Sequence, residues 1–155
     1  MPKLQSYNGR FCESEYENAF LAFLCEEGWE YLAGSNMERP SRREVLYADD
    51  LEQFLRNGNP DLTADDIRQI IDVVRLAGAE SDFATLHKVY GWMVNGIRFT
   101  PQNGQARAVS LIDFDDPDAN LFRAVNQFAV EYTDNGKTET RRPDILLYVN
   151  GRRFA

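Results

Sequence analysis

The sequence predicts an α+β fold in which a helical first two-thirds packs on a mainly antiparallel sheet formed by the last third. Apolar residues recur at helical spacing as far as Gly96 and alternate along the chain from Ile97 onward. A composition of 43% hydrophobic and 27% charged residues is ordinary for a globular protein. Neither repeats nor low-complexity tracts divide the 155 residues. We therefore expect a single domain over residues 1–155, helical over 1–96 and β over 97–155.

The first expected helix begins at Ser14, the N-cap of a capping box that Glu17 completes at the third helical position. An apolar, mainly aromatic stripe follows at helical spacing, through Tyr16, Phe20, Phe23 and Leu24, with Trp29 as a further candidate. Because such stripes are more often core than binding surface, we expect these rings to pack in the interior.

Three further helices are expected before the chain changes character. The second runs from Ala48 to Leu55, the third from its cap at Thr63 to Gly78, and the fourth from its cap at Ser81-Asp82 to Gly96. Each carries apolar residues at helical spacing, which predicts a buried face. In the fourth helix these residues are Phe83, Leu86, Val89, Tyr90, Met93 and Val94.

The last third reads as strands joined by tight turns. Ile97 to Phe99 and Ala108 to Phe114 flank Asn103-Gly104, which predicts a hairpin-like pair. Asn126 to Tyr132 alternates as a strand, and a turn at Asp134-Asn135-Gly136-Lys137 leads into a further strand over Thr138 to Val149. Within it, Ile145 to Val149 is apolar on both faces, so we expect this part to lie centrally in the sheet.

Charge and motif content exclude several classes of function. The net charge of -8 disfavours autonomous binding to DNA, because a protein that binds phosphates by itself usually carries a basic excess. Local basic groups remain, and each is either a phosphate contact or, more simply, a set of solvated surface arginines. They are Arg39, Arg42 and Arg43, then Arg141 and Arg142, then Arg152 and Arg153.

Other motifs are absent from the sequence. It holds neither GxxxxGK[ST] nor GxGxxG, so we expect no ATP site within this chain. One histidine and no clustered Cys/His pattern make a zinc site improbable. No apolar run reaches the roughly 18 residues of a membrane helix, and no leader pattern opens the chain, so a cytoplasmic location is expected.

An ordered series of motifs runs through the β part. Arg142-Pro143-Asp144 opens the apolar strand over 145–149, which ends in Asn150-Gly151, and upstream lie Leu111-Ile112-Asp113-Phe114, Asn120, Phe122 and Asn126-Gln127-Phe128. This series resembles the R subunit of type I restriction-modification enzymes, whose N-terminal nuclease domain belongs to the PD-(D/E)xK superfamily. The helical half from Glu15 to Gly28-Trp29 fits as well, so the resemblance covers nearly the whole chain. It implies a restriction-endonuclease-like α/β arrangement.

The resemblance also implies a metal site. In such sites two carboxylates from adjacent strands hold Mg²⁺, and a lysine two residues after the second carboxylate orients or activates water. The first carboxylate corresponds to Asp144, and Glu17 or Glu15 is the candidate for a further acidic ligand from the first helix. Arg141 and Arg142, which precede Asp144, are the expected contacts to nucleic acid.

The second half of that motif has no counterpart among these residues. No Asp, Glu or Lys follows Asp144, so the Glu-x-Lys strand is not matched and an incomplete sheet is expected. A lone carboxylate holds Mg²⁺ weakly at most, and we therefore expect this chain not to cleave DNA. In the simpler interpretation Asp144 only accepts hydrogen bonds or pairs with Arg142.

Three functions stay open at this point. The first is a truncated R-subunit segment without independent catalysis, whose parent uses ATP and Mg²⁺ to cleave unmodified foreign DNA together with modification and specificity subunits. The second is a non-enzymatic protein-interaction module. The third is an intact metal-dependent nuclease whose missing ligands come from another chain.

The strand over Ile145 to Val149 also predicts an assembly. Without a strand after Gly151, its unpaired edge favours either a homodimer through this strand or a short cover made by Arg152 to Ala155. We favour the dimer, because four residues are few for pairing and both Arg152 and Arg153 prefer solvent.

Overall fold

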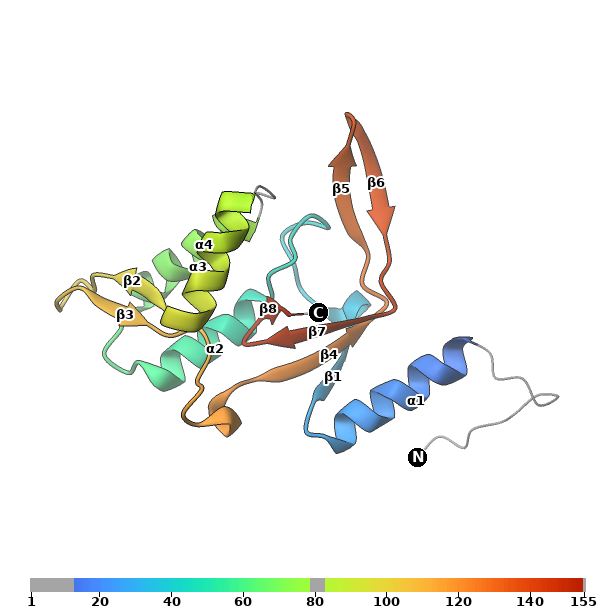
Figure 1. Ribbon diagram of the computed structural model, residues 1–155, viewed down its shortest axis with the longest axis horizontal. Helices are drawn as coiled ribbons and strands as arrows, with labels where there is room; N and C mark the ends of the chain where they lie inside the picture. The colour runs from blue at the N-terminus through green and yellow to red at the C-terminus, as the bar shows by residue number, and fades with distance from the viewer. Residues whose placement is uncertain (1–12, 79–82, 155) are drawn as a thin grey trace.

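The computed structural model describes residues 13–78 and 83–154. In these ranges the α-helices are α1 (Glu13–Glu26), α2 (Ala48–Gly58), α3 (Ala64–Gly78) and α4 (Phe83–Asn95). The strands are β1 (Glu30–Ala33), β2 (Ile97–Phe99), β3 (Arg107–Val109), β4 (Phe122–Asn126), β5 (Val130–Asp134), β6 (Lys137–Arg141), β7 (Ile145–Val149) and β8 (Arg152–Arg153). Short 3-10 helices span Gly34–Asn36 and Pro117–Ala119. Figure 1 shows α2, α3 and α4 gathered with β2 and β3 at one end of the molecule and α1 at the other, with the main sheet between them.

The main sheet has four strands in the order β1-β4-β7-β8 and does not close on itself. β1 runs parallel to β4, whereas β4–β7 and β7–β8 are antiparallel. This confirms the predicted α+β class, the mainly antiparallel sheet and its incompleteness. It also confirms the central position of β7, which lies between β4 and β8. β1 was not expected, because its four residues lie in the part of the sequence predicted to be helical.

The two long strands expected after residue 126 are each broken. β4 and β5 are separated at Gln127, which has a φ of 53°, and β6 and β7 are separated around Pro143, which has no N–H for a ladder hydrogen bond. The predicted tight turn is confirmed, since Asn135 and Gly136 both have positive φ (48° and 77°) between β5 and β6. The β5–β6 pair therefore projects from the sheet as a separate arm (Figure 1).

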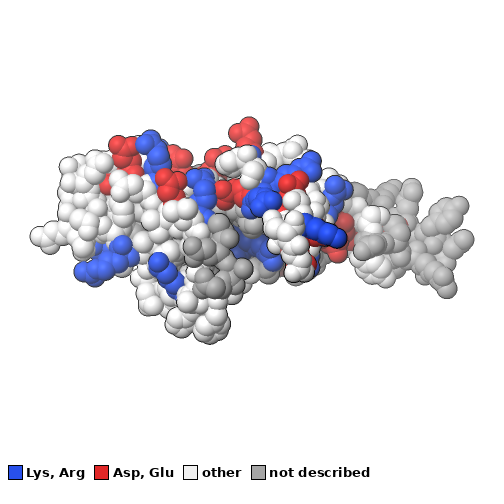
Figure 2. Space-filling view, turned by 90° about the horizontal axis from the view of Figure 1, so that it is seen from above, with Lys and Arg blue, Asp and Glu red and all other residues white. Residues whose placement is uncertain are grey.

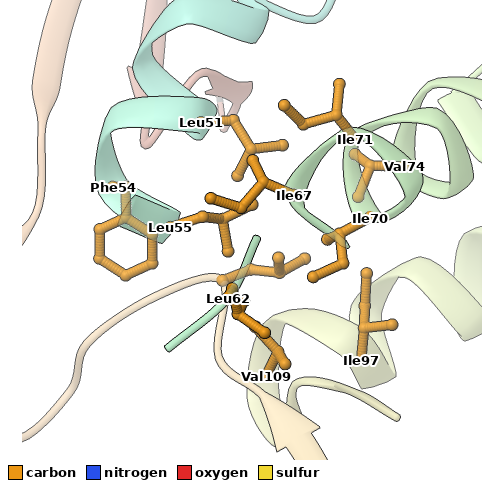
Figure 3. Close-up of a cluster of buried hydrophobic side chains, with 11 residues drawn as sticks. Leu51, Phe54, Leu55, Leu62, Ile67, Ile70, Ile71, Val74, Ile97 and Val109 are labelled. Carbon is orange, nitrogen blue, oxygen red and sulfur yellow. The ribbon is translucent and has the colours of Figure 1, made fainter. Parts of the chain in front are cut away.

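The largest cluster of buried side chains joins α2, α3 and the β2–β3 pair. Figure 3 shows the apolar faces of α2 and α3 pointing toward each other, with Ile97 and Val109 closing the cluster. The predicted cap of α3 is present: Thr63 Oγ1 accepts from the Asp66 amide at 3.1 Å, and Asp66 Oδ2 accepts from the Thr63 amide at 3.0 Å. Asp66 thus takes the place that Glu or Gln holds in the usual capping box.

Helix α1 contacts the sheet by a face that shares only Leu24 with the predicted one. Leu21 and Leu24 are buried with Ala124, whereas Tyr16, Phe20 and Phe23 are 64%, 47% and 53% exposed. Successive residues of an α-helix advance by about 100°, so the two leucines lie roughly a quarter turn from the aromatic stripe. The expectation of a buried stripe holds for Leu24 but was wrong for the three aromatic residues, because the sheet meets α1 on the leucine side.

Helix α4 repeats this pattern. Its predicted core face is largely exposed: Phe83, Leu86, Tyr90 and Val94 are 84%, 58%, 66% and 51% exposed. The helix contacts the α2–α3 cluster through Trp92, which lies on the opposite side of the helix from Phe83. Within the residues that are described, no helix is both long and apolar enough to cross a membrane.

Candidate functional site

Asp144 directly precedes β7 and is exposed to solvent. The first residue of β7, Ile145, pairs with Asn126, the last residue of β4, so Asp144 lies at the end of the sheet where β4 stops. In the described ranges Asp144 has neither a hydrogen bond nor an ion pair, and the expected alternative of a pair with Arg142 is not observed. Its carboxylate is therefore available to a ligand.

Glu17 reaches the same end of the sheet. Its Oε1 accepts a hydrogen bond from Asn126 Nδ2 at 2.9 Å, and Asn126 Oδ1 accepts one from the Tyr31 hydroxyl at 2.8 Å. Glu17 lies on the leucine face of α1, which explains why it points at the sheet. Helix α1 is described from Glu13, one residue before the predicted N-cap Ser14.

Glu17, Asn126 and Tyr31 are thus linked by hydrogen bonds, and the last two were assigned no role from the sequence. Asn126 was expected only as part of the Asn126-Gln127-Phe128 motif, and Tyr31 lies in the unexpected strand β1. Together they hold the carboxylate of Glu17 against β4, whose partner strand follows Asp144. The sequence signals this hydrogen-bonded contact only by the asparagine itself, which lies at a strand end. The structure therefore brings Glu17 and Asp144 to one end of the sheet without any direct contact between them.

These residues do not form a complete metal site. Over residues 13–78 and 83–154, no group of three or more His, Cys, Asp or Glu side chains lies close enough together to hold a metal ion. Mg²⁺ in proteins requires an octahedral set of oxygen ligands, and one or two carboxylates must be supplemented by water or substrate. The carboxylates of the described residues do not by themselves supply a complete ligand set for Mg²⁺.

The predicted nucleic-acid contacts lie beside Asp144 but differ in their surroundings. Arg141 ends β6, donates from Nε to the Tyr132 hydroxyl at 3.1 Å and places its guanidinium 5.0 Å from the Tyr132 ring centroid. Arg142 lies in the connection to β7 and is exposed. Both arginines can meet a phosphate, because the hydrogen bond of Arg141 to Tyr132 uses only Nε and its other N–H groups remain as donors.

Arg39 is not the solvated surface arginine that was expected. Its guanidinium stacks on Phe128 with 3.9 Å to the ring centroid and donates to the carbonyls of Arg42, Glu44 and Ala129 at 3.4, 3.1 and 2.7 Å. Burial lowers the pKa of Arg39. Arg39 therefore ties the segment before α2 to the end of β4, and it is excluded as a free phosphate contact.

The Asn150-Gly151 turn fixes the far end of β7. Asn150 is fully buried with a φ of 50°; its Nδ2 donates to Leu111 O and Asn120 Oδ1, and its Oδ1 accepts from the Leu121 amide at 2.7 Å. Gly151 has a φ of 76°, and a Cβ there would meet the backbone oxygen of Tyr47. The turn is therefore packed against the start of α2, and it holds the strand that Asp144 precedes.

Two more contacts hold the helices to this sheet. Asp50 of α2, 3% exposed, accepts from Arg123 Nε at 2.7 Å and from its Nη2 at 2.8 Å. Hydrogen bonding to Asp50 raises the pKa of Arg123. The Tyr148 hydroxyl donates to Val45 O at 2.7 Å, and burial raises the pKa of this tyrosine. β4 and β7 are thus each tied to α2 or to the segment before it, while the first residue of β7 lies at the open end of the sheet.

Comparisons with known proteins agree with the order of the motifs. Residues 10–155 match the family described as "Type I restriction enzyme R protein N terminus". The chain is 33% identical over 145 residues to the putative type I restriction enzyme MjaIXP endonuclease subunit of Methanocaldococcus jannaschii, covering 87% of this chain. It is 30% identical over 153 residues to the type I restriction enzyme HindI endonuclease subunit of Haemophilus influenzae, covering 90% of this chain. The chain spans 14% of the length of each of these relatives.

Proposed function

Since the chain belongs to the family of type I restriction enzyme R proteins, as an N-terminal segment of the R subunit, we propose that it supplies the nuclease-like part of a DNA-cleaving complex. The complete enzyme would use ATP and Mg²⁺ to cleave unmodified foreign DNA in the cytoplasm. ATP would be used outside these 155 residues, which contain neither phosphate-loop motif. Its partners would be the DNA and the modification and specificity subunits.

The observation that supports this proposal is the placement of Asp144. An exposed carboxylate without a described partner stands where β7 begins, and Glu17 is held at the same end of the sheet through Asn126. The PD-(D/E)xK arrangement uses such a carboxylate as its first metal ligand. We assign that role to Asp144 and a supporting acidic role to Glu17, with Arg141 and Arg142 as phosphate contacts beside them.

We further propose that residues 1–155 alone do not cleave DNA. Residues 145–155 contain no Asp, Glu or Lys, so the second strand carboxylate and the lysine of that arrangement have no counterpart after Asp144 in these residues. An arginine such as Arg153 does not replace the lysine, because a guanidinium stays protonated at neutral pH.

The test uses the purified chain with Mg²⁺ or Mn²⁺ on supercoiled plasmid and on linear DNA. We expect both DNAs to stay intact, and Asp144→Ala to behave like the unaltered chain. Metal-dependent cleavage that disappears in Asp144→Ala would show that these residues contain a complete site.

A second experiment tests the role assigned to Asp144. The same substitution is made in an active R subunit containing this segment, with Asp115→Ala as the control. Loss of cleavage with Asp144→Ala alone supports the assignment, and retained cleavage contradicts it.

Weak DNA binding is expected for this chain alone. Its net charge is -8, and Figure 2 shows basic and acidic side chains interspersed over the visible face. A surface of mixed sign releases few counterions from DNA, so duplex binding should vanish near physiological salt. Fluorescence anisotropy with a labelled duplex checks this, and submicromolar affinity at that salt would contradict it.

A second candidate function, a protein-interaction module, is favoured by the unburied apolar stripes of α1 and α4. A homodimer through β7 is one form of it. The alternative of a short cover does form, since β8 pairs with Tyr148 and Val149 and the Phe154 amide donates to Leu147 O at 2.7 Å. The expectation that four residues are too few to pair with this strand was therefore wrong. This leaves Ile145 for a second copy of the chain. Light scattering over a range of concentrations tests the dimer, and a strict monomer would rule it out.

A further inference from the structure

A cavity of about 470 Å³ lies away from Asp144, between the segment before α2, the last turns of α3, the first turns of α4 and strand β8. One wall is apolar and includes Val45, Val74 and Leu86. β8 pairs with the last two residues of β7, and Asp144 precedes the first. Five strand residues, roughly 17 Å, therefore separate the cavity from the proposed nuclease carboxylate.

The charged lining of the cavity is unbalanced. Four arginines line it, at positions 43, 75, 152 and 153, against one carboxylate, Glu44. Glu44 is already engaged, because its Oε2 accepts from Arg75 Nε at 2.8 Å and its Oε1 accepts from the Leu46 amide at 3.3 Å. Arg75 also donates to Asp72 at 3.0 Å. The other three arginines have no ion pair with any residue in the described ranges, in a chain whose net charge is -8.

Arg152 is the most constrained of these arginines. Its Nη1 is buried, and no atom of the described chain accepts a hydrogen bond from it. Burial lowers the pKa of Arg152, which reflects the cost of keeping a charged group away from water. Such groups are rare in folded proteins, and each needs a partner or an explanation. The expectation that Arg152 prefers solvent was wrong, because β8 turns its side chain toward the helices.

We propose that this cavity is a phosphate-binding site in which Arg152 is the central donor and Arg43 and Arg153 complete the contacts at the rim. A guanidinium offers paired N–H donors that match phosphate oxygens. A phosphate dianion offsets the three unpaired arginines better than a single carboxylate does, and it supplies acceptors for the unsatisfied Nη1. The apolar wall strengthens the attraction because it keeps the local dielectric low.

The phosphate can belong to a free small molecule or to a nucleic-acid backbone, and the chemistry at Arg152 is the same in both cases. The proposal is independent of the nuclease function, because none of its residues adjoins Asp144. A failure of either one therefore leaves the other standing.

The first experiment titrates inorganic phosphate into the full chain at constant ionic strength, followed by NMR of the arginine side chains and by the thermal midpoint. We expect saturable binding in the millimolar range, with Arg152→Met weakening it at least about tenfold, a loss of ~1.4 kcal/mol. Arg152→Lys should retain part of the affinity. Arg98→Met, which removes an exposed arginine outside the cavity, should leave binding within about twofold.

The stability readout separates binding from a merely structural role. Without phosphate, Arg152→Met should melt at the same temperature or higher, because an unpaired buried charge is replaced by an apolar chain. When phosphate is added, the thermal midpoint should rise for the unaltered chain and for Arg152→Lys, and not for Arg152→Met. Absence of saturable phosphate binding, or equal weakening of that binding by Arg98→Met, would overturn the proposal. If Arg152→Met fails to fold, phosphate binding by Arg43→Ala is measured in its place and should also be weakened.

Competition then distinguishes the two sources of phosphate. Adenosine monophosphate and a short oligonucleotide without terminal phosphates are each added to the phosphate-bound chain. Displacement by the mononucleotide alone indicates a small ligand, and displacement by the oligonucleotide indicates a backbone phosphate. If neither displaces inorganic phosphate at concentrations above its own Kd, the site is not one for phosphate esters and the proposal is overturned.

Discussion

Helices α2 and α3 differ from α1 and α4 in what becomes of their apolar stripes. In α2 and α3 the predicted faces are buried against each other, with Leu51, Leu55 and Ile70 wholly inaccessible. In α1 and α4 most of the predicted face is exposed, and the contacts are made mainly by other sides of the helices. All four helices have apolar spacing, so spacing alone does not decide which face is buried.

An apolar stripe on a helix is therefore buried only where a second apolar surface of matching size lies opposite it. α2 and α3 supply such surfaces to each other, and β2–β3 closes their cluster (Figure 3). α1 meets a sheet whose facing side chains, Ala124, Ile145 and Leu147, accommodate only Leu21 and Leu24. The remaining aromatic residues of α1 form an apolar surface of the kind that marks interaction sites.

The largest expected effect comes from a matched pair of phenylalanines in these two regions. Phe54 of α2 is 7% exposed and Phe23 of α1 is 53% exposed. We expect Phe54→Ala to lower the free energy of unfolding by about 3–5 kcal/mol, since it leaves a cavity in the α2–α3 cluster. Phe23→Ala should cost less than about 1 kcal/mol. Urea unfolding of the two variants measures both changes.

Equal losses in the two phenylalanine variants would show that the stripe of α1 is covered in solution. Concentration dependence of the Phe23→Ala effect would then identify the cover as a second copy of this chain. In that case the contrast between the two regions would describe the isolated chain only.

The sequence was sufficient where local chemistry decides the outcome. The Thr63 cap, the Asn135-Gly136 turn and the helical spans of α2 and α3 depend on neighbours within a few residues, and all are observed. The place of Ile145 to Val149 in the sheet followed from its apolar pattern on both faces. These predictions needed no knowledge of distant contacts.

The sequence was insufficient where a partner lies far along the chain. β1 is a strand because it pairs with β4 over ninety residues later, and nothing within its four residues indicates this. The Glu17–Asn126 bond joins residues 109 positions apart, and it redirects a side chain that also fitted a local cap. Asp144 was identified by resemblance to a family, whereas its surroundings came from the tertiary structure.

A smaller effect concerns the contact between the helical region and the sheet at Gly151. We expect Gly151→Ala to destabilise the chain by at least about 2 kcal/mol, because a Cβ would meet the backbone of Tyr47 and the φ of 76° disfavours a side chain. Gly136→Ala is the control, since its φ of 77° is similar and its Cβ would meet nothing within 4 Å. That variant should cost about 1 kcal/mol from backbone strain alone.

Thermal unfolding of the two glycine variants isolates the close approach of α2 to the turn. The midpoint should fall further for Gly151→Ala than for Gly136→Ala. Equal shifts would mean that α2 moves away from the turn at little cost, and the two regions would then be less tightly coupled than the structure indicates.

The smallest expected effect is a pH dependence at the cap of α3, in the well-buried region. Hydrogen bonding from the Thr63 amide, and further from the Gln102 amide at 3.0 Å, lowers the pKa of Asp66 below its ordinary value of 3.8. A carboxylate with a lowered folded pKa contributes stability that is fully present above the unfolded value and is lost as pH falls through the folded value. We therefore expect Asp66→Asn to lower the thermal midpoint at pH 7, and the difference in midpoint between variant and unaltered chain to narrow below about pH 4.

The control is Asp65→Asn, which alters an exposed partner of Arg68 and should lower the midpoint less at pH 7. An Asp66→Asn gap that stays constant from neutral to acid pH would show that the Asp66 charge adds nothing to the cap, and that the shape of the side chain is what holds α3 to the β2–β3 connection.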